Sequence, residues 1–230
     1  PRGVRDPRQV ERREELHAGI DDRAHEVLVV RDHVELAARA GDDPVAYRLS
    51  ILSDKRARKL VDLVAERCNW KARGPVGSGK GLGMAFARYK NTAAYCAVAA
   101  AVTVSETVRV DRVWCVADSG LVVNPDGARN QLEGGVIQAV SWTLKEQVKL
   151  DDQGIASRDW DAYPILRFSE VPEIRAELVD GAGNPTLGVG ECSVGPTAAA
   201  VGNAVAHALG VRIHDMPLTR ERVMAALLKT

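Results

Sequence analysis

One carboxylate stands in the middle of a glycine-rich loop near the C-terminal end of the chain. The loop reads Gly188-Val189-Gly190-Glu191-Cys192-Ser193-Val194-Gly195-Pro196, and a helix is expected to follow it. Glycines let the backbone approach a ligand closely or adopt positive φ, and unpaired N–H groups at a helix N-terminus favour an anion. Glu191 is therefore a candidate acid–base residue beside a bound ligand. A glutamate in an ordinary surface turn is the alternative, and the loop taken alone favours that alternative.

A second candidate lies where a long helix is expected to begin. In Gln131-Leu132-Glu133-Gly134-Gly135, two adjacent glycines fall in the first turns, where each costs about 1 kcal/mol relative to alanine. The glycines could permit tight helix packing or the close approach of a large ligand. In the second case, the Gln131 amide could both donate and accept hydrogen bonds at the edge of a polar ring.

A third glycine-rich stretch, Gly74–Gly81, matches most of the phosphate-binding pattern G-x-x-x-x-G-K. Gly81 stands where a Ser or Thr hydroxyl would hold magnesium. A helix is expected before the stretch and a strand after it, so no helix N-terminus would face a phosphate. We interpret the stretch as a flexible linker, and a nucleotide-hydrolysing enzyme is the least favoured function.

Cysteine usage and charge exclude several classes of protein. The four cysteines form no C-x-x-C pair, so a zinc or iron–sulfur site built from this chain is not expected. Cys96 and Cys115 lie in apolar runs typical of a core, whereas Cys192 is expected to be more exposed. The 31 basic and 31 acidic residues balance, so the basic excess typical of a nucleic-acid-binding protein is absent. No run approaches the roughly 18 apolar residues that span a bilayer.

The apolar pattern predicts the elements that must position these residues. Residues recurring every fourth position from Leu132 to Val148 should form an apolar stripe on the long helix, which Asp126 is expected to cap. Paired strands with segregated helices indicate an α+β fold, with a core of small side chains because only 4% of residues are aromatic. We expect helices over 33–39, 44–52, 54–68, 126–148, 196–210 and 219–228, and strands over 83–89, 94–104, 107–117, around Ile165 and over 174–179.

Three segments occur in the order found in one enzyme family. They are Asn124-Pro125-Asp126-Gly127, the stretch 130–138 that contains Gln131, and Gly188-Val189-Gly190-Glu191. On these segments the chain resembles the molybdenum hydroxylases, the xanthine dehydrogenase/aldehyde oxidase family. It is most similar to the large subunits of the isoquinoline 1-oxidoreductase and nicotinate dehydrogenase group, which 88–92 and 159–172 also fit. The resemblance covers roughly residues 32 to 228.

The resemblance implies roles for the candidate residues. In this family the glutamate of the Gly-Val-Gly-Glu loop is the general base, so Glu191 would take a proton from a metal-bound hydroxyl. The resemblance also implies contacts to a molybdenum–molybdopterin cofactor, in its cytosine dinucleotide form. These contacts would come from Gln131, Gly188, Val189 and Gly190. No protein side chain would ligate the metal.

The resemblance also implies a reaction and partners. The reaction would be oxidative hydroxylation of an N-heterocycle or an aldehyde, with water as the oxygen source. Electrons would pass to iron–sulfur clusters on a separate small subunit, and a cytochrome c is one further acceptor. A non-catalytic homologue or assembly module with the same fold is the alternative. The protein would be soluble, and the choice between cytoplasm and periplasm stays open.

Other cofactor-contacting loops of the family, of the Gly-Gly-x-Phe and Gly-Gln-Gly types, do not occur in this sequence. We therefore expect a C-terminal fragment of the large subunit, inactive by itself. Its expected organisation is a charged, poorly ordered segment over 1–31 that matches nothing, a helical segment over 32–73 and the molybdopterin-binding domain over 74–230.

Overall fold

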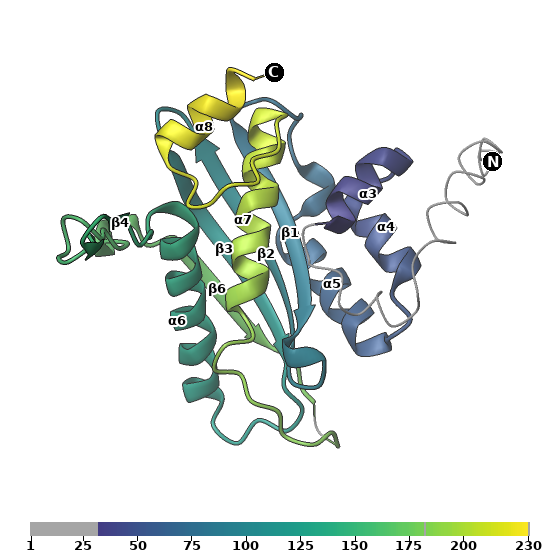
Figure 1. Cartoon of the computed structure of the whole chain (residues 1–230). Helices are drawn as coiled ribbons and strands as arrows, with labels where there is room; N and C mark the ends of the chain where they lie inside the picture. Colours follow the sequence, from purple (N-terminus) through teal and green to yellow (C-terminus); the bar gives the residue numbers. More distant parts are fainter. Residues whose placement is uncertain (1–31, 182, 230) are drawn as a thin grey trace.

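The computed structural model describes residues 32–181 and 183–229, so the expectation for residues 1–31 lies outside the described residues. A four-stranded sheet in the order β1-β2-β3-β6 forms the centre (Figure 1). β1 (Lys80–Arg88), β2 (Tyr95–Val104) and β3 (Val108–Asp118) form an antiparallel meander. β6 (Glu173–Leu178) joins β3 in parallel after a long crossover.

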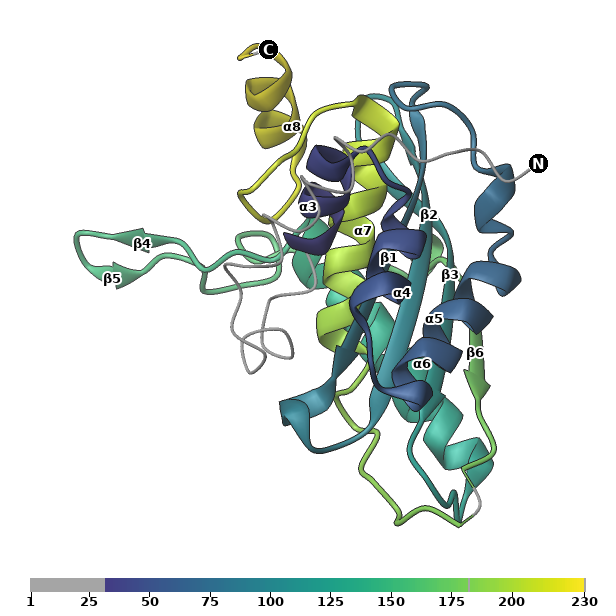
Figure 2. The same cartoon turned by 90° about the vertical axis from the view of Figure 1, so that its right-hand side faces the viewer.

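Helices cover both faces of the sheet (Figures 1 and 2). α4 and α5 pack on one face, α3 packs on α4, and α6 and α7 pack on the other face. The mixed α+β fold expected from the sequence is confirmed. The helices are α3 (Asp32–Ala40), α4 (Pro44–Ile51), α5 (Lys55–Arg67), α6 (Pro125–Leu144), α7 (Val194–Leu209) and α8 (Arg220–Leu227), with single 3-10 turns at Trp70–Ala72, Tyr89–Asn91 and Phe168–Glu170.

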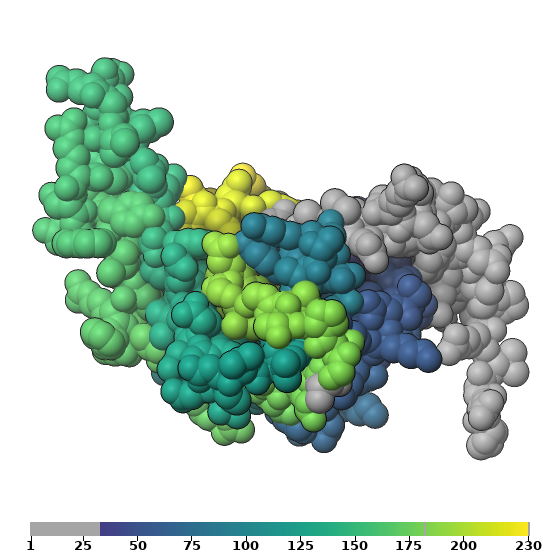
Figure 3. Space-filling view, turned by 90° about the horizontal axis from the view of Figure 1, so that it is seen from below, coloured from purple at the N-terminus to yellow at the C-terminus, as the bar shows by residue number. Residues whose placement is uncertain are grey.

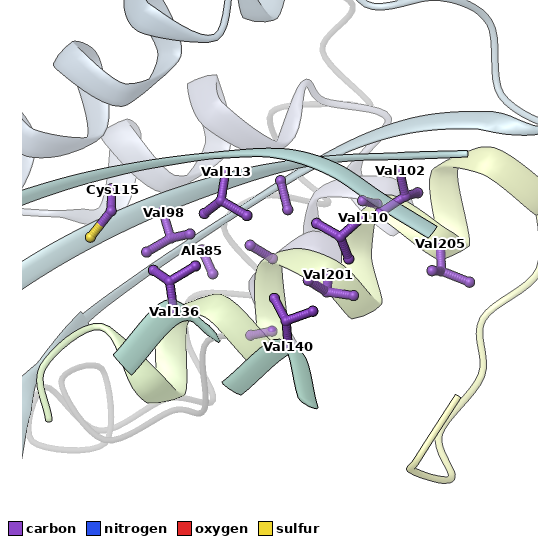
Figure 4. Packing of buried hydrophobic residues seen from close by; sticks show 14 of the residues in the cluster. Ala85, Val98, Val102, Val110, Val113, Cys115, Val136, Val140, Val201 and Val205 are labelled. Atoms are coloured by element: carbon purple, nitrogen blue, oxygen red, sulfur yellow. The ribbon is translucent and has the colours of Figure 1, made fainter. Parts of the chain in front are cut away.

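The two cores follow from the alternation of side chains along the strands. On β2, Cys96, Val98 and Ala100 face α6 and α7, whereas Tyr95 and Ala97 face α5, because successive residues of a strand point to opposite faces. Figure 4 shows valines from the sheet and from both helices meeting in the first of these cores. The core of small side chains predicted from the composition is confirmed.

Small residues also bring α7 unusually close to β1. A Cβ atom at Gly81 or at Gly83 would overlap the main chain of Ala204 in α7. The glycines are therefore required by the approach of the helix, and not by their own backbone angles. This contact fixes the position of α7 over the sheet.

The start and end of α6 differ from the prediction. Asn124, and not Asp126, caps the helix: its Oδ1 accepts a hydrogen bond from the Gly127 N–H at 3.0 Å. Pro125 then occupies the first helical position, where its missing N–H costs nothing. The apolar stripe is buried at Leu132, Val136 and Val140, but Val148 lies beyond the helix end and is 56% exposed. Its assignment to the stripe was wrong.

The strand predicted around Ile165 is also wrong. Residues 156–167 contain no helix or strand, and Pro164 lacks the N–H that a ladder would need. The crossover instead includes a small hairpin, β4 (Leu150–Asp151) with β5 (Gly154–Ile155), which projects from the body of the molecule (Figure 2).

The stretch Gly74–Gly81 does not form a phosphate-binding loop. The N–H groups of Gly77 and Gly79 donate to the main-chain oxygens of His207 and Ala208, both at 2.9 Å. A strand, β1, follows the loop. The loop is thus a connection fastened to the C-terminal end of α7, and the Gly77 and Gly79 amides are already used.

Candidate functional site

The Gly-Val-Gly-Glu loop lies beside the start of α6. Seen from below, the chain preceding α7 passes between the first turns of α6 and the turn that follows β1 (Figure 3). The Ser193 hydroxyl donates to the Leu132 main-chain oxygen at 3.0 Å and ties the loop to the helix. Ser193 therefore makes no side-chain cap at the N-terminus of α7. α7 begins at Val194, slightly earlier than predicted, and ends before Gly210 with φ of 73°, as expected.

Residues of α6, the crossover residues Ile165 and Leu166, and Gly190 of the loop line a groove of about 540 Å³, hereafter the α6 groove. Gln131 and Gly190 both line it, and a Cβ atom at Gly190 would lie 3.7 Å from the Gln131 Oε1. Gly188 and Val189 do not line the groove; Gly188 is exposed, and Val189 packs against the core. Polar or bare positions on its walls are Asn130, Gln131, Gly134, Gly135, Gln138, Ser141, Glu146 and Gly190.

The two adjacent glycines of α6 differ in their surroundings. A Cβ atom at Gly135 would overlap the Ser193 Oγ, so Gly135 permits tight packing of the loop on the helix. At Gly134 a Cβ atom would meet no described atom within 4 Å. Gly134 instead leaves one wall of the groove bare, where a ligand could approach the helix backbone.

Glu191 is exposed and accepts a hydrogen bond from the Tyr89 hydroxyl. That bond raises the pKa of Tyr89, with partial desolvation and the negative charge of Glu191 acting in the same direction. Tyr89 was not among the candidate residues, although it lies in the family-like segment 88–92. Nothing in the local sequence links it to Glu191, because the contact spans 102 positions.

Cys192 is buried, with 1% of its surface exposed, so the expectation of greater exposure was wrong. After Glu191 the chain turns inward, and Cys192 joins Cys96 and Cys115 in the core. The Sγ atoms of Cys96 and Cys115 are 3.5 Å apart, too far for a disulfide bond. Within the described residues, no group of three or more His, Cys, Asp or Glu side chains could hold a metal ion.

A second hollow of about 550 Å³ lies at the far end of α6, between that helix end, the start of β3, the crossover segment and residues 218–220. None of the candidate residues lines it. The α6 groove is therefore the candidate site, since Gln131 and Gly190, from the two segments predicted to act together, meet there. Glu191 itself does not line the groove.

The chemistry of the α6 groove suits a planar, polar heterocycle. The Gln131 and Gln138 amides offer both donors and acceptors, and Gly134 and Gly190 leave space for a ring to approach. These residues fit a pterin ring.

A family model described as molybdopterin cofactor-binding domain matches residues 20–172. The chain belongs to the molybdopterin-binding xanthine dehydrogenase/aldehyde oxidoreductase family. The expected family is thereby confirmed. The match begins at residue 20, inside the segment 1–31 that was expected to match nothing.

Similar proteins place the chain within this family. It is 43% identical to a nicotinate dehydrogenase subunit of Pseudomonas putida, over 84% of this chain and 18% of that protein. It is 35% identical to the beta subunit of isoquinoline 1-oxidoreductase from Brevundimonas diminuta, over 80% of this chain and 24% of that protein. The chain thus spans no more than about a quarter of the length of these two relatives.

Solved structures agree with the fold. Quinoline 2-oxidoreductase from Pseudomonas putida 86 superposes with a TM-score of 0.55 at 31% identity, over 59% of this chain and 19% of that chain. Aldehyde oxidoreductase from Desulfovibrio gigas superposes with a TM-score of 0.72 over 85% of this chain and 40% of that chain. Since its identity is 14%, that second match supports the fold alone.

No described helix has the length and apolar character needed to cross a membrane.

Proposed function

We propose that this chain forms the C-terminal part of the catalytic large subunit of a molybdenum hydroxylase that oxidises an N-heterocycle or an aldehyde. The observation that carries the proposal is the meeting of Gln131 and Gly190, the residue before Glu191, at one groove in a chain that belongs to the molybdopterin-binding family. The N-heterocycle class is supported by the names of the relatives, a nicotinate dehydrogenase and an isoquinoline oxidoreductase.

In this proposal the chain provides one wall of the cofactor site and the base. Gln131 hydrogen-bonds to the pterin, and Gly190 lets the loop backbone lie beside it. Gly188 and Val189 belong to the same loop but do not line the groove. When bound, the molybdenum cofactor supplies the two-electron oxidation and activates the water that provides the oxygen atom. Glu191 receives the proton at its carboxylate, which is a competent base beside a metal-activated water.

The remaining parts of the proposal concern the whole enzyme. The cofactor would be the cytosine dinucleotide form, and electrons would leave through iron–sulfur clusters of a small partner subunit towards an acceptor such as a cytochrome c. Support for a partner comes from the two relatives, which are themselves named as subunits and so belong to larger assemblies. A soluble enzyme of the cytoplasm or periplasm would fit this arrangement.

Metal analysis of the full-length large subunit, purified with its partner, tests the proposal. We expect one molybdenum atom per large subunit and hydroxylation of an N-heterocycle such as nicotinate. Absence of molybdenum would favour a non-catalytic homologue or assembly module with the same fold. A Glu191→Gln variant should keep its molybdenum but lose about 100- to 10,000-fold in kcat, the usual effect of losing a general base.

A matched control separates loss of the base from loss of any surface carboxylate. Glu177 pairs with Arg67 at 2.7 Å on β6, away from the α6 groove. The Glu177→Gln variant should therefore keep both molybdenum and turnover. Near-normal turnover of Glu191→Gln in a molybdenum-containing enzyme would show that Glu191 is not the base.

A further inference from the structure

We propose that Tyr89 is a positioning residue for Glu191, and that its hydroxyl fixes the carboxylate in the orientation needed for proton transfer. The inference rests on the proposed function, in which Glu191 is the base. It goes beyond that function because it assigns a role to the turn after β1, and the proposed function gives that turn no role.

Tyr89 holds its hydroxyl in a fixed position because both its backbone and its ring are fixed. The Tyr89 main-chain N–H donates to the Ala94 main-chain oxygen at 2.9 Å. The Tyr89 main-chain oxygen accepts from the Ala93 N–H, also at 2.9 Å. Lys90 and Asn91 adopt positive φ, 51° and 59°, and give this turn its tight shape. The ring is half-buried against the core between the sheet and helices α6 and α7. The hydroxyl is therefore presented at a defined point.

Glu191, in contrast, has little else to orient it. Its side chain is exposed and lies on a loop. Within residues 32–181 and 183–229, Tyr89 is the one side chain found hydrogen-bonded to its carboxylate, and no cation forms an ion pair with it. A free glutamate side chain samples many rotamers, so loss of the Tyr89 hydroxyl would release it.

A phenol suits this task better than a cation would. An arginine or lysine would stabilise the charged carboxylate strongly and so weaken it as a base. The neutral hydroxyl engages Oε2 of Glu191 and leaves Oε1 available to receive a proton. Because contact with Glu191 raises the pKa of Tyr89 above the ordinary value near 10, the phenol stays protonated and remains a donor at neutral pH.

The first test is the Tyr89→Phe variant of the full-length holoenzyme, which removes the hydroxyl and keeps the ring. We expect kcat to fall about 10- to 100-fold, the effect of losing a hydrogen bond to a charged group. KM and molybdenum content should stay within about twofold, since the ring still packs on the core. The matched control is Tyr95→Phe, because the Tyr95 hydroxyl donates to Asp54 Oδ2 at 2.8 Å on the opposite face of the sheet. That control should retain kcat.

A double-mutant cycle tests whether Tyr89 acts through Glu191. Once Glu191→Gln has removed the base, Tyr89→Phe should cause no further loss of kcat, because coupled residues are not additive. A full additional loss in the Glu191→Gln background would overturn the inference. A normal kcat in the Tyr89→Phe variant would also overturn the inference. If Glu191→Gln were inactive in that case, the proposed function would still stand. Full activity of Glu191→Gln would overturn the proposed function itself.

An ultraviolet titration of the phenols gives a readout that does not need turnover. Subtracting the Tyr89→Phe curve from that of the unmodified enzyme isolates the ionisation of Tyr89. In the Glu191→Gln background the same difference should show ionisation at lower pH, because the negative charge of Glu191 is gone. An unchanged midpoint would mean that the two side chains are not in contact in the holoenzyme, and would overturn the inference.

Discussion

The Ser193 hydroxyl donates a hydrogen bond to the main-chain oxygen of Leu132 at 3.0 Å, across 61 positions of sequence. Leu132 adjoins Gln131, and Ser193 lies two residues after Glu191. One buried hydrogen bond therefore joins the helix that carries the candidate pterin contact to the loop that carries the candidate base. Both residues are completely buried, so the bond is shielded from competition by water.

Gly135→Ala should destabilise the protein although alanine is the better helix former. The new Cβ atom would overlap the Ser193 Oγ, and rotating that hydroxyl away leaves it buried without its acceptor, which costs about 1–3 kcal/mol. The gain in helix propensity is about 1 kcal/mol, so we expect a net loss of roughly 1 kcal/mol in the free energy of unfolding. Urea titration followed by circular dichroism would measure it.

Gly134→Ala is the matched control for that variant, since its Cβ atom would meet no described atom. It should leave stability unchanged or slightly raised. Adding Ser193→Ala to Gly135→Ala removes the overlapping atom, so the double variant should cost less than the sum of the two single changes. Strict additivity would show that the Gly135–Ser193 contact does not limit packing.

Gln131→Ala should reduce molybdenum occupancy of the full-length enzyme without loss of stability. The side chain is exposed at the α6 groove, and alanine favours the helix. Elemental analysis would measure the metal, and the midpoint of thermal unfolding would report stability. Glu133→Ala, on the same helix but outside the groove, should retain its molybdenum. Equal metal loss in both variants would contradict a specific role for Gln131.

Gly83→Ala should be more damaging than its single methyl group suggests. The new Cβ atom would overlap main-chain atoms of Ala200 and Ala204 in α7, and main-chain atoms cannot rotate out of the way. Overpacking of this kind costs about 1–3 kcal/mol, measurable as a lower midpoint in urea. Ala85, two residues along the same face, already carries a methyl group, so Ala85→Gly should also destabilise, in that case by leaving a void.

The ion pair between Arg56 and Asp118 should make stability depend on acid pH. Asp118 accepts from Arg56 Nη2 at 2.6 Å and Nε at 2.8 Å, and its side chain is 6% exposed. Burial raises the pKa of Asp118, but the hydrogen bonds from Arg56 and the Gly120 N–H, with the positive charge of Arg56, lower it below its ordinary value overall. Since the unfolded chain then binds the proton more readily, this pair contributes its full stability above about pH 4 and loses it as pH falls further.

Asp118→Asn should lower the free energy of unfolding by about 1–3 kcal/mol at pH 7, because the partly exposed Arg56 guanidinium loses its charged partner. The difference between variant and parent protein should shrink as pH falls from about 4 to 2, because protonation then removes the same charge from the parent. Glu66→Gln, which alters an exposed pair with Arg67, should change stability by less than about 1 kcal/mol. A pH-independent difference for Asp118→Asn would show that the carboxylate charge is not what stabilises this contact.

The sequence by itself determined the elements whose signals are local. The apolar alternation of β2 and β3 and the glycine that ends α7 depend on neighbours within a few residues, so their bounds were predicted closely. Gln131 and Glu191 could be named because each stands in a short segment with glycines at fixed spacing. The cap of α6 was misassigned by two residues, since Asn124 and Asp126 are equally good capping side chains and Pro125 decides between them.

The tertiary structure decided what depends on distant partners. Ile165 has an apolar, strand-like neighbourhood, yet no described strand lies beside it for pairing. Cys192 follows an exposed glutamate, yet it is buried in the same core as Cys96 of β2 and Cys115 of β3. Tyr89 reaches Glu191 because a turn after β1 and a loop before α7 meet at one end of the sheet. Such contacts are set by the packing of α7 on β1, and no local pattern of residues encodes which two loops that packing brings together.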